Sequence, residues 1–442
     1  MNAQRKAPAA VAGADRGMDS YLPEHGNGGY QVRHYDLDLD YRLGPGRLSG
    51  RARITAAAGP SLSAFSLDLE DSFKVGRVTV SGKAARYTHR GGKLRVRPAK
   101  PVPAGADFVV DLRYVGTPVP VRSAHWGEIG WDQLTDGVIV ASQPIGAPSW
   151  FPCNNTPADK AAYRISVTTA TPYTVVANGV LVSQRTNAST TTWVYESTAP
   201  MAAYLATVQI GQYELVDLGP AQRAAVPGRL LPVFGHDFGR QPEMMSAFEA
   251  LFGQYPFEEY TVVVVDDELD VPIEAQGLSV FGTNHVDGYR GAEHLVAHEL
   301  AHQWFGNSLT VADWRHIWLN EGFATYAEWL WSECSGGVPA AGLAARSRSE
   351  LARQRQDLRV SDPGARRMFD DRVYQRGALT LQALRVEVGD DAFFALLREW
   401  TLVNRHCTVT TEQFTTLAQR HTDRPLAPLF RRWLHETPMP LA

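Results

Sequence analysis

Residues 293–328 read EHLVAHELAHQWFGNSLTVADWRHIWLNEGFATYAE, and the rest of the chain is interpreted from this stretch. His298 and His302 belong to an H-E-x-x-H motif, and their spacing of four places them on one face of an α-helix. Two imidazoles on one face can bind the same metal ion, and Glu299 lies within reach of a water on that metal. Glu321 follows His302 after 18 intervening residues and offers the third protein ligand that a catalytic zinc site needs.

Size and composition limit the class of protein. The 442 residues are enough for two or three domains with their own cores. A hydrophobic content of 44% and a charged content of 20% are ordinary for a soluble globular protein. The net charge of −4 argues against nucleic acid or an anionic membrane as a partner, because both need a basic surface. The apolar runs are too short to span a bilayer.

Cysteine usage and the N-terminus indicate the compartment. Cys153, Cys334 and Cys407 are an odd number of cysteines at distant positions, which suits a reducing environment and predicts packing roles. Residues 1–28 are polar and rich in Ala, Gly and Pro, and they contain no apolar core of signal-peptide length. We therefore expect a disordered tail over residues 1–28 and a soluble, cytoplasmic protein.

Residues 29–217 show the period of two that is typical of half-buried strands. Tyr35, Leu37 and Leu39 alternate with aspartates, and the same alternation recurs several times further along. The dipeptide Asn178-Gly179 predicts a hairpin with a type I′ turn, which needs positive φ at both central residues. Many short strands separated by turn signals predict an N-terminal antiparallel all-β domain.

Residues 218–442 are mainly helical in pattern. Apolar residues recur at helical spacing before Gly253 and again before Gly389, so both glycines are expected to end helices. Residues 410–413 form a capping box in which Thr410 and Gln413 would satisfy each other's backbone amides. The two helices that carry the metal motif are expected at about 292–305 and 320–333.

These motifs resemble the M1 family of zinc metallopeptidases, the gluzincin aminopeptidases. The family signature is H-E-x-x-H, 18 residues and then Glu, and this chain carries it in HELAHQWFGN and WLNEGFATYAEW. Residues 151–163, FPCNNTPADKAAY, are also similar to the family segment F-P-C-x-D-x-P-x-x-K-A-x-F. Asn155 stands where the family usually has Asp, and we expect that change to be structural.

The resemblance implies a fold and a cofactor. The expected fold is α+β and multidomain, with the antiparallel β domain (29–217) followed by a thermolysin-like, mainly helical zinc catalytic domain (218–442). One Zn²⁺ per chain is expected on His298, His302 and Glu321, with Glu299 as the general base. The chain is expected to be a short form that lacks the C-terminal helical domain of longer relatives.

The resemblance also implies roles for three residues outside the zinc motif. Residues 373–377, VYQRG, are similar to the family's Y-x-K-G segment, which makes Tyr374 the expected donor to the tetrahedral intermediate. Residues 271–278, VPIEAQGL, align with G-A-M-E-N-x-G-L, and Glu274 falls on the glutamate that binds the substrate's free α-amino group. Gln143 stands where the family has a glutamine that reaches into the active site.

The leading hypothesis is a zinc aminopeptidase that hydrolyses the N-terminal peptide bond of peptides with a free N-terminus. A zinc endopeptidase is one alternative, and it would not need Glu274. An epoxide hydrolase is another, because one M1 branch catalyses both reactions. A non-catalytic M1-like scaffold is the third, although such a chain should have lost a metal ligand or the base. The sequence does not predict an oligomeric state.

Overall fold

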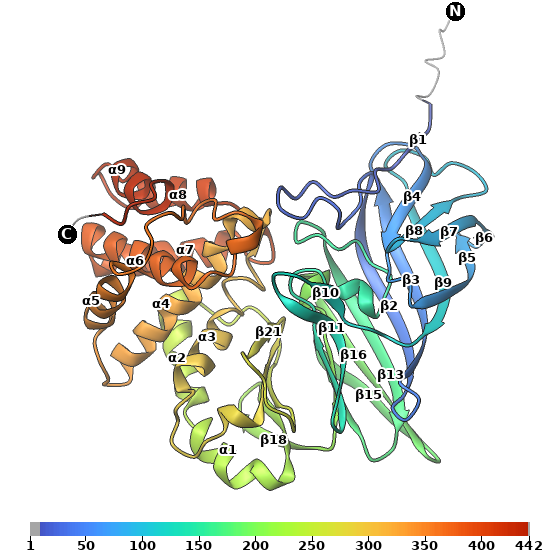
Figure 1. The fold of residues 1–442 in the computed structure, drawn as a ribbon, viewed down its shortest axis with the longest axis horizontal. Coiled ribbons are helices and arrows are strands. Elements are labelled where there is room, and N and C mark those ends of the chain that lie inside the picture. The colour runs from blue at the N-terminus through green and yellow to red at the C-terminus, as the bar shows by residue number, and fades with distance from the viewer. Residues whose placement is uncertain (1–8, 441–442) are drawn as a thin grey trace, which may run out of the picture. The chain divides into compact units, whose positions relative to one another are not determined.

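The protein is described by a computed structural model that covers residues 9–440. The chain divides between Ile210 and Gly211 into two compact units, of which the first is built of strands and the second carries the helices (Figure 1). No helix among residues 9–440 combines the length and the apolar character needed to cross a membrane.

The first unit contains an eight-stranded sheet. In spatial order its strands are β15 (Val180–Asn187), β16 (Thr190–Ala202), β13 (Lys160–Ala170), β2 (Tyr30–Arg42), β3 (Arg47–Ala58), β9 (Asp107–Gly116), β5 (Phe73–Val80) and β6 (Lys83–Ala84). Neighbouring strands run antiparallel except β2 and β13, which pair in parallel with Tyr35 opposite Tyr163. The predicted antiparallel arrangement does not hold at this pairing, because a long stretch of chain joins the two strands and no tight turn fixes their direction.

The predicted alternation of β2 is confirmed. Tyr35, Leu37 and Leu39 are each at most 3% exposed, whereas Asp38 and Asp40 point to the other face and are exposed. Since side chains of a strand alternate between its two faces, one face of the sheet forms the core of the unit and the other is polar.

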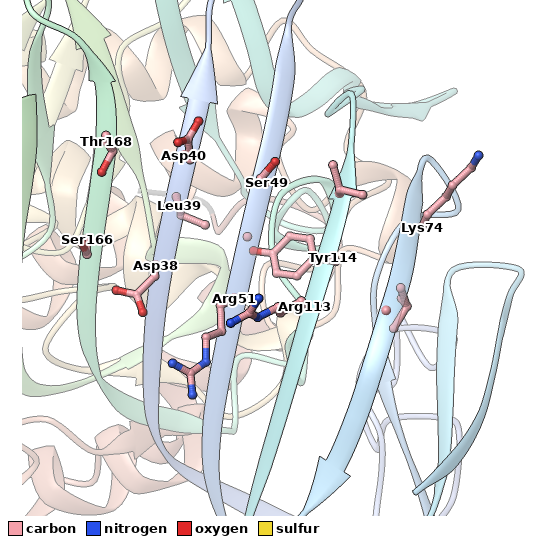
Figure 2. A pocket seen from close by; sticks show the side chains of 14 residues that line it. Asp38, Leu39, Asp40, Ser49, Arg51, Lys74, Arg113, Tyr114, Ser166 and Thr168 are labelled. Atoms are coloured by element: carbon pink, nitrogen blue, oxygen red, sulfur yellow. The ribbon is translucent and has the colours of Figure 1, made fainter. Parts of the chain in front are cut away.

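An open hollow of about 710 Å³ lies on the polar face of this sheet (Figure 2). The side chains that Figure 2 labels around it include Asp38, Asp40, Ser49, Arg51, Lys74 and Arg113. None of the metal-ligating or catalytic residues predicted from the sequence lines this hollow.

Two smaller sheets complete the first unit. One has the order β1 (Val11–Ala12), β4 (Leu62–Asp68), β8 (Lys93–Arg97), β7 (Arg86–Arg90). The other has the order β10 (Val121–Ser123), β11 (Gly127–Leu134), β12 (Gly137–Ala141), β17 (Val208–Gly211), β14 (Thr174–Ala177). Short 3₁₀ turns lie at Ala147–Ser149 and Ala203–Leu205.

The predicted disordered tail does not hold for residues 9–28. Strand β1 pairs with β4, and the backbone amide of Asn27 donates to Asn154 Oδ1 at 2.7 Å. The side chain of Asn27 donates to Asp68 Oδ2 at 3.0 Å in the buried interior. Long-range polar contacts of this kind order a segment whose composition alone indicates disorder. The part of the prediction that concerns residues 1–8 lies outside the described residues.

The predicted hairpin at Asn178-Gly179 is also wrong. Gly179 has the expected positive φ of 93°, but Asn178 is not among the residues with positive φ. The preceding strand β14 and the following strand β15 belong to different sheets. The buried Asn178 side chain donates to Leu205 O and accepts from Thr207 N, so it holds a crossing between sheets.

The second unit begins with a five-stranded sheet. Its order is β18 (Tyr213–Gly219), β19 (Gln222–Pro227), β20 (Tyr260–Val264), β22 (Leu278–Phe281), β21 (Ile273–Ala275). The predicted boundary after residue 217 falls inside β18, because this strand pairs with β19 and continues the sheet of the second unit. β21 is an edge strand, and it carries Glu274.

Helices make up the rest of the second unit. They are α1 (Leu231–Asp237), α2 (Gln241–Phe252), α3 (Glu293–Ala301), α4 (Trp318–Cys334), α5 (Ala340–Leu351), α6 (Asp371–Val388), α7 (Asp390–Val403), α8 (Thr411–Arg420) and α9 (Ala427–Phe430). Short helical turns at Gly228–Leu230, Thr283–His285, Trp314–His316, Ala365–Arg367 and Arg431–His435 and a small pair, β23 (Thr310–Val311) with β24 (Thr408–Val409), connect them.

The two glycine stops and the capping box are confirmed, whereas α3 ends at Ala301 and not near residue 305. α2 and α6 end at Gly253 and Gly389, whose φ values are 95° and 85°, a conformation that glycine adopts without steric cost. Thr410 and Gln413 form the predicted capping box at the start of α8.

The cysteines only partly follow the prediction of packing roles. Cys153 is buried, whereas Cys334 and Cys407 are exposed, and all three are free thiols. Burial raises the pKa of the Cys153 thiol well above its ordinary value, which keeps this thiol protonated and unreactive.

Candidate functional site

Helix α3 presents two histidines to one point. His298 lies in the last turn of α3 and His302 caps it, with their ring centroids 4.7 Å apart. The Nδ1 atom of His298 lies 2.7 Å from Glu328 Oε1, and that of His302 lies 3.0 Å from the carbonyl oxygen of Phe305. Because both partners are acceptors, Nδ1 carries the proton in the neutral form of each imidazole, and Nε2 is then the nitrogen that can bind a metal.

Glu321 completes a three-residue ligand set from α4. Its Oε2 atom lies 3.5 Å from His298 Nε2 and 3.4 Å from His302 Nε2. The ligand atoms of these three buried residues all lie within 4.8 Å of one another. Two imidazole nitrogens and one carboxylate oxygen are a donor set that catalytic zinc prefers, and they leave a fourth position open. The structure therefore brings together the three residues that the sequence predicts as ligands.

Glu328 supports this set from the next turns of α4. The sequence places it seven residues after Glu321 and therefore on the same helical face. Its contact with His298 Nδ1 fixes the orientation and tautomer of that imidazole. The residues present thus fit a zinc ion both in the donors that face it and in the acceptors behind them.

Glu299 lies beside the ligand set. Its side chain is 4% exposed, and its Oε2 atom is buried with no hydrogen-bond partner among residues 9–440. A buried carboxylate oxygen without a partner is costly, and such an atom is typical of a place where a substrate or water is handled. Burial raises the pKa of this carboxyl, and the two histidines act in the opposite direction.

Glu274 reaches the same place from strand β21. A carboxylate oxygen of Glu274, one of Glu299 and a ring nitrogen of His302 lie within 4.8 Å of one another. β21 pairs with β22, with Glu274 opposite Ser279, and its other edge has no strand partner in the sheet. The structure therefore brings the three glutamates 274, 299 and 321 together from β21, α3 and α4.

Two residues that the sequence did not single out hold β21 against the end of α3. The side-chain amides of Gln303 and Asn307 donate to the carbonyl oxygen of Ala275 at 3.2 and 3.0 Å. Gln303 Oε1 also accepts from Gly277 N at 2.8 Å. Both residues lie within the HELAHQWFGN stretch, one and five residues after His302. Their proximity to the histidines was a usable signal, but their partner on β21 was not visible in the sequence.

Tyr374 lies over the site from helix α6. Its ring stacks on that of His298, with centroids 6.0 Å apart and planes 16° from parallel. Burial and then the charges of Glu321, Glu274 and Glu299 raise the pKa of the phenol well above its usual value. The hydroxyl therefore stays protonated and is available as a hydrogen-bond donor.

The charges of the ligand set favour one another. Although burial opposes ionisation of Glu321, the neighbouring imidazoles lower its pKa to about 2. Burial disfavours the charged forms of His298 and His302, but Glu321, together with Glu328 beside His298, raises the pKa of both imidazoles. The carboxylate of Glu321 is thus anionic over the physiological range, as a metal ligand must be.

Gln143 lies in the first unit, shortly after β12, and its Nε2 atom is buried without a hydrogen-bond partner among residues 9–440. The other predicted site residues all belong to the second unit. The role of Gln143 toward a substrate stays a prediction.

Comparison with known proteins gives consistent matches over both units. Residues 237–433 match the family model described as "Peptidase family M1 domain", and residues 135–205 match "Peptidase M1 N-terminal domain". A solved M1 zinc metallopeptidase from Deinococcus radiodurans is 30% identical with a TM-score of 0.87, over 96% of this chain and 98% of that one. Another structure of that protein is described as bound to a Tyr-Ser-Ala substrate.

One more distant solved structure and two curated proteins are also similar to this chain. Native leukotriene A4 hydrolase from Saccharomyces cerevisiae shares the fold, with a TM-score of 0.78 at 21% identity over 93% of this chain and 69% of that one. Leucine aminopeptidase 2-1 of Meyerozyma guilliermondii is 28% identical over 64% of this chain and 48% of its own length. Human aminopeptidase RNPEPL1 is 26% identical over 80% of this chain and 52% of its own length.

The chain spans about half the length of these curated relatives. The Deinococcus structure, in contrast, is covered almost completely, at 30% identity and with the same fold. Taken with the two family models and the converging His298, His302 and Glu321, this similarity shows that the chain belongs to peptidase family M1.

Proposed function

We propose that this protein is a zinc-dependent aminopeptidase that releases the N-terminal residue of peptides. The observation that carries the proposal is the convergence of His298, His302 and Glu321, with the unpaired carboxylate oxygen of Glu299 next to them. Glu274 adds a further carboxylate at the same point, as recognition of a free amino group requires.

His298, His302 and Glu321 would hold one zinc ion per chain. When bound, Zn²⁺ supplies Lewis-acid polarisation of the scissile carbonyl and lowers the pKa of a bound water. Glu328 and the Phe305 carbonyl keep both imidazoles in the tautomer that presents Nε2 to the metal. The M1 relatives named as zinc metallopeptidases support this assignment.

Glu299 would transfer the proton, and Tyr374 would stabilise the negative charge of the intermediate. Glu299, as general base, takes the proton from the attacking water and later gives it to the leaving amine. The Tyr374 hydroxyl donates a hydrogen bond to the oxyanion that develops on the former carbonyl oxygen. The stacking of Tyr374 on His298 places this phenol beside the ligand set, which supports the role.

Glu274 would make the reaction an exopeptidase reaction. A peptide's free α-amino group is cationic near neutral pH, and a carboxylate in the site binds it and aligns the first peptide bond. The Tyr-Ser-Ala complex of the Deinococcus relative supports peptides as substrates. Gln143 is proposed as a further substrate contact, and a cytoplasmic location stays a prediction.

Metal dependence tests the proposal directly. Purified protein should contain about one zinc per chain, since the site offers three ligands. A panel of aminoacyl fluorophores should be cleaved, a chelator should abolish cleavage, and added zinc should restore it. Metal-free protein, verified by elemental analysis, that cleaves the panel at the untreated rate would overturn the proposal.

A further inference from the structure

Helices α4 and α6, which carry Glu321 and Tyr374, cross at a pair of glycines. An alanine Cβ at Gly322 would lie 2.8 Å from Gly377 Cα and 2.9 Å from its carbonyl carbon. An alanine Cβ at Gly377 would lie 2.7 Å from Gly322 Cα. Real Cβ atoms do not approach other carbon atoms this closely, and backbone atoms cannot rotate away as a side chain can. Any side chain at either position must therefore push the two helices apart.

Each glycine lies next to a residue of the site. Gly322 directly follows Glu321 in α4, and Gly377 lies three residues after Tyr374, one turn along the same face of α6. The crossing therefore sets how closely the phenol approaches the ligand set. Glycine is a poor helix former in the middle of a helix, so its use at both contact points costs helix stability.

Helix α6 is also held from outside the crossing. The Arg376 guanidinium is buried and donates to the carbonyl oxygens of Trp433, Arg432, Glu436 and Thr437 at 2.6–2.9 Å. Arg376 contacts these carbonyls, and the next residue, Gly377, contacts α4. The two contacts together fix the position of α6. A shift of α6 would move Tyr374 with it.

We propose that Gly322 and Gly377 are positioning residues, which place the Tyr374 hydroxyl over the ligand set by allowing α4 and α6 to touch through their backbones. This inference rests on the proposed function in that it assigns Tyr374 to the reaction. It goes further by assigning the geometry of that donor to two residues that do not touch the substrate.

The test compares Gly377→Ala in the wild-type and Tyr374→Phe backgrounds, well below the melting temperature of each variant. With Tyr374 present, kcat should fall by about 10- to 100-fold with KM and zinc content nearly unchanged, because a misplacement of about 1 Å has that effect. In the Tyr374→Phe background, the same substitution should change kcat by less than about twofold, since the donor it displaces is gone. Gly235→Ala is the matched control, because Gly235 is helical and, among residues 9–440, no heavy atom beyond its chain neighbours and its own helix backbone lies within 4 Å of the added Cβ.

Three outcomes would overturn the proposal. The first is wild-type kcat in Gly377→Ala, and the second is an equal loss of kcat in both backgrounds, which indicates a general structural effect. The third is failure of both Gly377→Ala and Gly322→Ala to fold, since the crossing would then serve stability alone.

A crystal structure of Gly377→Ala separates this inference from the proposed function. The Tyr374 hydroxyl should be displaced from Glu321 by about 1 Å or more relative to wild type, whether or not the wild type cleaves peptides. An unmoved hydroxyl would contradict the positioning role, whereas an inactive wild type with a displaced hydroxyl would contradict only the aminopeptidase assignment.

Discussion

At the scale of single residues, the chemistry depends on which groups stay charged and which stay protonated. Glu321 is held anionic by two imidazoles, while burial and the charges of Glu321, Glu274 and Glu299 keep Tyr374 as a neutral phenol. The same cluster of negative charge therefore provides a metal ligand and preserves a hydrogen-bond donor. A phenolate at this position could neither donate to an oxyanion nor remain close to three glutamates.

Tyr374→Phe should keep its zinc and its fold and lose about two to three powers of ten in kcat, the usual effect of removing one oxyanion donor. Tyr289→Phe is the matched control, because the Tyr289 side chain is 87% exposed. Steady-state kinetics and zinc analysis of both variants give the result. Equal kcat in wild type and Tyr374→Phe would show that the phenol has no part in the reaction.

At the scale of secondary-structure elements, the spacing of residues within one helix or strand could be predicted from the sequence. The contacts between elements that are far apart in the chain could not. The i, i+4 spacing placed His298 and His302 together, and the same face of α4 connected Glu321 with Glu328. The contact between Asn307 and Ala275 joins the loop after α3 to an edge strand, and no periodicity predicts such a pairing. The same reason accounts for the parallel pairing of β2 with β13 and for the crossing at Asn178.

The sequence also could not show what the arginine in the Y-x-K-G-like segment does. Arg376 stands where the family has a lysine, so the sequence predicts only that this position carries a positive charge. In the structure Arg376 is 5% exposed, its guanidinium donates to backbone carbonyl oxygens, and burial lowers its pKa to about 10. Its planar fork, and not merely its charge, fits this role.

Arg376→Lys should therefore destabilise the second unit by about 2–4 kcal/mol, because an ammonium cannot reach all the carbonyls that the guanidinium satisfies. Urea denaturation of wild type and variant measures the difference. Arg353→Lys, an exposed site in the same unit, should leave the free energy of unfolding within about 0.5 kcal/mol of wild type. An equally small effect for Arg376→Lys would show that charge alone suffices.

At the scale of the whole molecule, one buried carboxyl makes the stability of the first unit depend on pH. In the first unit, burial raises the pKa of Asp159 to about 7, although Asn154 and the Val32 amide donate to it. The folded state thus binds this proton more tightly than the unfolded state. The resulting stability is fully present below the unfolded pKa of about 3.8 and is lost as pH rises through about 7.

Asp159→Asn should flatten the fall in stability of the first unit between pH 4 and pH 8. The wild type should lose at most about 4 kcal/mol more than the variant over this range, from about 1.4 kcal/mol per pKa unit. The slope against pH is the measured quantity, because the amide also changes the hydrogen bond with Asn154 at every pH. Parallel slopes for the two proteins would show that Asp159 is ionised throughout.

The family assignment applies to both units, but the choice between exopeptidase and endopeptidase depends on Glu274. Four of the five residues aligned with the family's G-A-M-E-N differ here, and only the glutamate is kept. The structure brings that carboxylate to His302 and Glu299. Recognition of a substrate's free amino group therefore depends on the single retained residue Glu274.

The most direct test is kcat/KM on paired peptides, one with a free N-terminus and one N-acetylated, for wild type and Glu274→Ala. Wild type should cleave the free peptide and not the acetylated one, because acetylation removes the charge that Glu274 binds. Glu274→Ala should keep its zinc and lose the equivalent of about 2–5 kcal/mol in kcat/KM on the free peptide. Equal cleavage of both peptides by wild type, or an unchanged rate in Glu274→Ala, would contradict the aminopeptidase assignment and favour a zinc endopeptidase.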